Sequence, residues 1–159
     1  MRNRINKKLI AGAVLVSAVV FGSLAYSHCQ IPCGIYDDEA RFAAIAEHIT
    51  TIEKAMKEIE SLSAQAKPNM NQIVRWVNNK DQHADELSEI VTYYFMAQRI
   101  KAAPESDAKA YGDYVKKLTL LHQMVVRSMQ AKQTTDLAHV QALRTLLEQF
   151  HAAYSGKAG

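Results

Sequence analysis

Beyond residue 36, apolar residues recur every three or four positions along most of the chain, with charged and amide side chains between them. This spacing places the apolar residues on one face of a helix, whereas a strand would require strict alternation. The pattern predicts four helices over residues 37–63, 71–99, 107–130 and 136–154. Short segments that contain Pro68 and Pro104 interrupt the pattern between them. Four amphipathic helices joined by short loops predict an all-α, up-and-down four-helix bundle.

The same pattern predicts where the helices begin and which side chains they bury. Asp37 and Asp38 suit a first helical turn, Ser106 or Asp107 can cap the third helix, and Thr134 or Thr135 can cap the fourth. The inward-facing residues expected of the second helix are Ile73, Val74, Trp76, Val77, Ala84, Leu87, Ile90, Val91, Tyr94 and Phe95. Those expected of the third helix are Tyr111, Tyr114, Val115, Leu118, Leu121, His122, Val125 and Met129.

Residues 1–27 differ in character from the rest of the chain. Four basic residues are followed by an apolar run over residues 9–24 and by small residues at positions 25 and 27. This order is typical of a signal peptide, and cleavage after Ser27 would make His28 the new amino terminus. An uncleaved membrane anchor would need about 20 apolar residues, more than this interrupted run supplies. We therefore expect export to the periplasm or the cell exterior with no stable membrane anchor after cleavage. If the segment is a propeptide instead, the mature protein is cytoplasmic.

Removal of this leader changes the charge balance. The whole chain has 19 Lys and Arg against 16 Asp and Glu, and four of the basic residues lie in the leader, so 15 remain against 16. A nearly neutral chain with no basic stripe gives no indication of nucleic-acid binding. The remaining length suits one domain. The expected organisation is a leader over 1–27, a short segment over 28–36 and the bundle over 37–159.

Both cysteines of the chain lie in the segment 28–36, which reads HCQIPCGIY. An exported protein would ordinarily pair them in a disulfide, but so short a loop constrains the unfolded chain very little. A metal is the alternative, because the free amine of His28, the amide nitrogen of Cys29 and the two thiolates can share a plane. The His28 imidazole can then approach from the axial side. Planar nitrogen and sulfur donors suit nickel(II) or copper(II) better than zinc.

Two further readings of the cysteine pair are open at this point. An exported copper-binding or metal-delivery protein could hold copper(I) with a CxxxC pair and a nearby histidine, and would not need a histidine at the free terminus. A helical interaction protein could carry an incidental disulfide. A variant extended by one residue before His28 would distinguish copper delivery from a site that uses the terminal amine. Only the site that uses the amine should lose its activity.

The complete segment resembles the amino-terminal nickel hook of the nickel superoxide dismutases, whose motif is His-Cys-x-x-Pro-Cys-Gly-x-Tyr directly after a processing site. Every fixed position of the motif is present, and the helical remainder, including QIVRWVNNKDQHA, is similar to that family along most of its length. The resemblance implies conversion of two superoxide ions to dioxygen and hydrogen peroxide by Ni(II)/Ni(III) cycling. It also implies one nickel ion per subunit, a homohexamer of four-helix bundles and a leader-processing peptidase.

The resemblance also implies roles for individual residues. His28, Cys29 and Cys33 match the metal ligands, and Tyr36 matches the tyrosine that stands over the open face of the metal. Arg75 matches an arginine that holds the axial histidine.

Tyr94 resembles a second tyrosine of the family's site. The chain departs from the family pattern at Gln30, where many members have aspartate. It also offers no secure counterpart of the glutamate that binds the axial histidine, because Ala43 and Ala44 stand near its expected place.

The other five histidines are spread over all the predicted helices: His48, His83, His122, His139 and His151. None has a histidine or carboxylate four positions away in an arrangement that suggests a second metal site. We therefore expect all five to be ordinary surface or packing residues.

Overall fold

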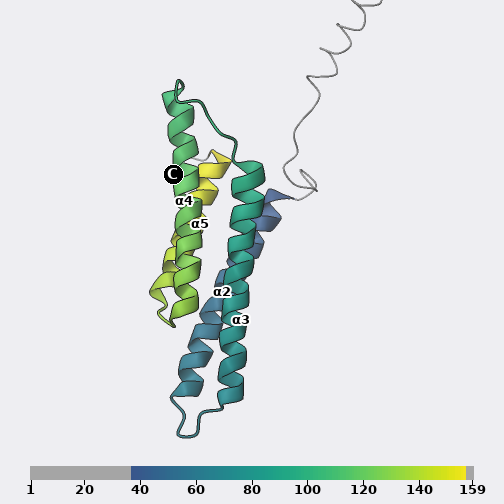
Figure 1. Cartoon of the computed structure of the whole chain (residues 1–159), viewed down its shortest axis with the longest axis vertical. Helices are drawn as coiled ribbons and strands as arrows, with labels where there is room; N and C mark the ends of the chain where they lie inside the picture. Colours follow the sequence, from purple (N-terminus) through teal and green to yellow (C-terminus); the bar gives the residue numbers. More distant parts are fainter. Residues whose placement is uncertain (1–36, 157–159) are drawn as a thin grey trace, which may run out of the picture. The chain divides into compact units, whose positions relative to one another are not determined.

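The structure is a computed structural model, and it describes residues 37–156. The helices are α2 (Asp38–Ser63), α3 (Met70–Glu89), α4 (Ala108–Gln133) and α5 (Ala138–Ser155), and a π-helix, η1 (Ile90–Arg99), continues α3 without a break (Figure 1). Within these residues there is no strand. The predicted leader and the predicted hook lie outside the described residues.

The four helices pack as a closed ring of neighbours. α2 contacts α3 and α5, and α4 contacts the same two helices. Figure 1 shows α2 beside α3 and α4 beside α5. The predicted all-α four-helix bundle is therefore confirmed. Its core is formed by apolar side chains from every helix: Phe42, Ile45, Ile49, Ile52, Met56, Ala84, Leu87, Val91, Tyr94, Phe95, Leu120, Leu121, Met124, Ala131, Val140, Leu143, Leu146 and Phe150.

Side-chain caps begin three of the helices. The carboxylates of Asp37 and Asp107 each accept a hydrogen bond of 3.0 Å from a backbone N–H of the first turn, and the Asn69 side chain does the same for α3. The predicted starts of the first and third helices are therefore confirmed. The fourth helix begins at Ala138 rather than 136, because Thr134 and Asp136 form successive turns before it.

The π-helix was not expected from the sequence. The predicted second helix ends at Arg99 as observed, but its last ten residues are more widely wound. The N–H of Ile100 accordingly donates to the carbonyl of Phe95, five positions back, at 2.9 Å. Such segments occur often at functional sites, and this one buries Tyr94 and Phe95.

The predicted inward faces of two helices need correction. Val74 in α3 and Val115 and Met129 in α4 are 52%, 41% and 51% exposed. His122, also expected to face inward, is exposed as well. Leu121 is buried as expected, and the other buried residues of α4 are Leu120, Met124, Ser128 and Ala131. Apolar residues occupy adjacent positions in this helix, so its sequence allows two overlapping stripes, and packing against α3 and α5 selects one of them.

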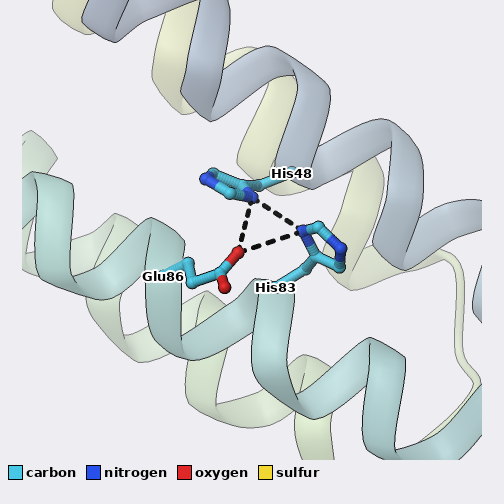
Figure 2. Close-up of side chains that lie close together, drawn as sticks. All are labelled: His48, His83 and Glu86. Carbon is cyan, nitrogen blue, oxygen red and sulfur yellow. Dashed lines mark hydrogen bonds and ion pairs between the residues drawn. The ribbon is translucent and has the colours of Figure 1, made fainter.

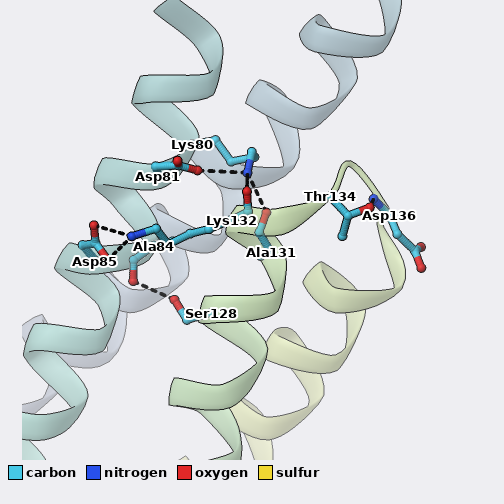
Figure 3. A network of polar contacts seen from close by, with 9 residues as sticks. All are labelled: Lys80, Asp81, Ala84, Asp85, Ser128, Ala131, Lys132, Thr134 and Asp136. Carbon is cyan, nitrogen blue, oxygen red and sulfur yellow. Dashed lines mark hydrogen bonds and ion pairs between the residues drawn. The ribbon is translucent and has the colours of Figure 1, made fainter. Parts of the chain in front are cut away.

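Polar contacts also join the helices. His48 of α2 and His83 of α3 lie with their Nδ1 atoms 2.8 Å apart (Figure 2). The ammonium group of Lys80, a buried residue of α3, donates to the carbonyls of Ala131 and Lys132 at 2.8 and 2.5 Å (Figure 3). These carbonyls belong to the last turn of α4, where a helix attracts positive charge. Lys80 therefore fastens α3 to the carboxyl end of α4.

None of the helices within residues 37–156 is long and apolar enough to cross a membrane.

Candidate metal centre

The predicted nickel ligands His28, Cys29 and Cys33, together with Tyr36, lie outside the described residues. The described chain begins at Asp37, directly after Tyr36. Asp38, the first residue of α2, is therefore only two positions beyond the hook and shows how the bundle holds the point where the hook is attached.

Asp38 is the centre of a hydrogen-bonded cluster that joins three elements. Its Oδ1 accepts from the hydroxyl of Tyr94 at 2.5 Å, and its Oδ2 accepts from Arg99 at 2.6 Å and from the hydroxyl of Tyr154 at 2.7 Å. Tyr94 and Arg99 belong to η1, and Tyr154 belongs to α5. We call these four residues the Asp38 cluster. It fixes the first turn of α2 to the rest of the bundle.

The cluster sets the protonation states of its members. Burial acts to raise the pKa of Asp38, but the hydrogen bonds from Arg99, Tyr94 and Tyr154 outweigh it and hold the pKa below the ordinary 3.8. Burial, together with the hydrogen bond to Asp38, raises the pKa of Tyr94 to about 12. Burial and Asp38 likewise raise the pKa of Tyr154. At neutral pH the carboxylate is therefore ionised and both phenols remain hydrogen-bond donors.

Two guanidinium groups approach the Tyr94 ring. The guanidinium carbon of Arg41 lies 5.3 Å from the ring centroid, and that of Arg99 lies 5.9 Å from it. Cations at this range are attracted by the face of an aromatic ring. Positive charge therefore gathers around the ionised Asp38 and the Tyr94 ring, close to the root of the hook.

The structure does not bring Arg75 and Tyr94 together within one chain. Arg75 is exposed in the first half of α3, nineteen positions before Tyr94, which corresponds to roughly 28 Å along a helix. Of these two predicted site residues, only Tyr94 lies close to Asp38, where the hook joins the bundle. Sequence reasoning gave Asp38 only a helix-dipole role and missed Arg99 and Tyr154 altogether, because their partners are at least 55 positions away.

Hollows lined by lysines lie next to the Asp38 cluster. One, of about 660 Å³ between α4 and α5, is lined by Lys109, Lys116, Lys117 and Tyr154 among others. A second, of about 360 Å³, is lined by Arg99, Lys101, Lys117 and Tyr154. A concave surface lined with positive charge raises the local concentration of small anions. An anionic substrate would therefore be attracted to these hollows.

The remaining histidines were expected to be ordinary surface or packing residues, but two of them lie close together. His48 and His83 lie beside Glu86, and one ligand atom from each of the three side chains can be chosen so that all lie within 4.8 Å of one another (Figure 2). His122 is exposed, and His151 pairs with Glu39 at 3.0 Å. Sequence reasoning sought pairs within one helix and could not see a pair formed between α2 and α3.

Comparison with known proteins identifies the family of this chain. The sequence profile of the family described as nickel-containing superoxide dismutase matches residues 23–157, a span that includes the whole hook and all four helices. No curated protein and no solved structure gives a match. The copper-delivery alternative gains no support from the family match. The chain therefore belongs to the nickel-containing superoxide dismutases, oxidoreductases that act on superoxide and use nickel as their cofactor.

Proposed function

We propose that the mature chain begins at His28 and disproportionates superoxide at one nickel ion held by His28, Cys29 and Cys33. The observation that carries this proposal is the uninterrupted hook motif over residues 28–36 inside the family match. The donor set fits nickel, because thiolate and deprotonated amide ligands are anionic and stabilise its higher oxidation state. Nickel would supply the one-electron chemistry of the reaction.

The tyrosines next to the hook have a positioning role in this proposal. Tyr36 is proposed to hold water or the superoxide ion close to the open face of the metal. Tyr94 remains a neutral donor because its pKa is about 12, and its hydrogen bond holds Asp38 two positions beyond Tyr36. The Asp38 cluster would thus fix the point at which the last residues of the hook join the bundle.

The location of Arg75 restricts how it could support His28. Because it lies roughly 28 Å from Tyr94 along the helix, it can support His28 only with the hook extended along α3 or across a subunit boundary. A neighbouring subunit is the arrangement that we propose.

The metal and the amino terminus are best tested together. Protein purified from cells that process their own leader should have an intact mass beginning at His28, one nickel per chain and a rhombic Ni(III) paramagnetic resonance signal. A variant extended by one residue before His28 should fold but lose turnover, because its terminal amine is displaced. Full activity in the extended variant, or copper in place of nickel, would contradict the proposed ligand set.

We propose that residues 1–27 are removed by a leader-processing peptidase and that the mature enzyme is exported. The arrangement of basic, apolar and small residues in this segment supports the proposal. Ala25→Asp should block cleavage, so that the chain keeps its leader and binds no nickel. A matched Asn3→Asp variant lies far from the cleavage point and should be processed normally. Nickel-loaded protein with an intact leader would refute the need for processing.

We propose that the enzyme assembles as a homohexamer. Burial of the hook against a neighbour would shield its thiolates from oxidation by peroxide. Exposed apolar side chains, among them Met70 and Val74 at 64% and 52%, are candidates for the contact surface. Sedimentation should give the mass of six chains, and Val74→Glu should reduce it. The matched change Lys67→Glu, in the loop before α3, should leave the assembly intact. A wild-type protein that sediments as a monomer would contradict this proposal.

A further inference from the structure

His48, His83 and Glu86 form a compact group of potential metal ligands between α2 and α3. The Nδ1 atoms of the two histidines are 2.8 Å apart, and Oε2 of Glu86 lies 3.5 Å from the first and 3.4 Å from the second. Figure 2 shows the three atoms facing one another, with His48 on one helix and the other two residues on the next. Donor atoms from two helices thus converge on one point.

These separations match the face of a tetrahedral zinc site. Zinc binds nitrogen and oxygen ligands at about 2.0–2.1 Å, so tetrahedral ligands lie about 3.3 Å from one another. A triangle with edges of 2.8, 3.4 and 3.5 Å leaves room for an ion about 2.0 Å from each corner. The bound ion would require only small adjustments of the side chains.

A neighbouring side chain orients the carboxylate of this group. Gln82 donates from its amide nitrogen to Oε1 of Glu86 at 2.8 Å, which leaves Oε2 directed at the histidines. A hydrogen bond of this kind orients a carboxylate ligand. The carboxylate of Glu86 is therefore held in an orientation that suits a metal ligand.

We propose that His48, His83 and Glu86 bind one zinc(II) ion at a second metal site, separate in its ligands from the amino-terminal hook. The side chains are 16%, 24% and 38% exposed, so water can reach the fourth coordination position. Zinc at this site would join α2 to α3 through residues 35 positions apart. Two imidazoles and one carboxylate suit zinc better than the planar nitrogen and sulfur set of the hook does.

The first experiment uses the processed, nickel-loaded enzyme, whose hook is already occupied. Calorimetric titration with zinc chloride should show one zinc bound per chain, and X-ray absorption at the zinc edge should show nitrogen and oxygen ligands near 2.0 Å without sulfur. His83→Ala should weaken zinc binding on the order of a hundredfold, and His122→Ala, which changes an exposed histidine of α4, should leave it unchanged. Sulfur ligands, no zinc binding, or equal affinities for both variants would overturn the proposal.

A second variant separates this site from the hook. The double change Cys29→Ser and Cys33→Ser removes both thiolates, so it should abolish nickel binding but keep the zinc affinity. Zinc should raise the unfolding temperature of this variant by several degrees and have no such effect once His83→Gln is added. Circular dichroism of each variant checks that the helices are retained. Loss of zinc binding with the cysteines, in a folded chain, would assign the zinc to the hook and refute the second site.

Discussion

The change Asp38→Asn tests the cluster that holds the root of the hook. An amide in place of this carboxylate retains its shape, but in either orientation its NH2 group faces at least one of three donors: the hydroxyl of Tyr94, the guanidinium of Arg99 or the hydroxyl of Tyr154. The substitution therefore removes the charge and at least one of the hydrogen bonds. We expect the free energy of unfolding to fall and the hook to lose its fixed attachment.

The size of the effect follows from these contacts. Hydrogen bonds to a charged group contribute about 1.5–3 kcal/mol each. Three donors share one carboxylate that is 23% exposed, and the amide oxygen can still accept from one or two of them, so their contributions do not add fully. We expect a loss of about 2–3 kcal/mol. With a urea dependence of about 1–3 kcal/mol per molar, the midpoint should decrease by roughly 1–2 M.

Urea unfolding followed by circular dichroism is the assay, with turnover of the nickel-loaded protein as a second measurement. Asp113→Asn is the matched control, because Asp113 is an exposed carboxylate that pairs with Lys109 one helical turn away. The control should unfold at the wild-type urea concentration. The reasoning is refuted if Asp38→Asn unfolds at the wild-type midpoint or if the control loses as much stability.

The pH dependence of this difference gives a further check. The pKa of Asp38 is lower in the folded protein than its ordinary 3.8, so its contribution is fully present above pH 3.8 and is lost as the pH falls through the folded value. The difference between wild type and Asp38→Asn should be constant from about pH 5 to pH 8 and shrink below about pH 4. A difference that shrank near pH 6 would indicate a histidine instead.

Three other predictions concern neighbouring groups. Lys80→Met should lower the free energy of unfolding by about 2–4 kcal/mol, measured in urea, because it leaves two carbonyls at the end of α4 without their buried donor. Tyr94→Phe should remove from the ultraviolet titration the phenol that ionises near pH 12. The same change should remove a contribution to the free energy of unfolding that is present below pH 10 and lost as the pH rises through 12. Lys117→Glu should lower kcat/KM for superoxide severalfold at low salt and much less at high salt. Lys67→Glu, the same charge change outside the lysine-lined hollows, should leave kcat/KM unchanged. Equal effects of the two variants would contradict attraction of superoxide at the hollows.

The helices were predictable from the sequence to the extent that their signals are local. Asp37 and Asp107 cap the helices that they were expected to begin, and Pro68 and Pro104 lie in the loops between helices. The predicted inward face of α4 was partly wrong, because adjacent apolar residues define two overlapping stripes and packing against the neighbouring helices determines which one is buried. The π-helix was missed because its wider winding has no distinct sequence signal in this chain.

The amino-acid sequence alone was sufficient to predict the family, because the residues of the motif over 28–36 are consecutive; the nickel ligands within that segment stay a prediction. The sequence could not supply the contacts of Asp38 or the pairing of His48 with His83, because these contacts join residues 35 to 116 positions apart that meet only when the helices pack. Arg75 shows the reverse case, since a residue assigned by resemblance lies far from Tyr94 within one chain. Contacts between helices depend on their relative rotation and register, and the packing of the complete core sets both.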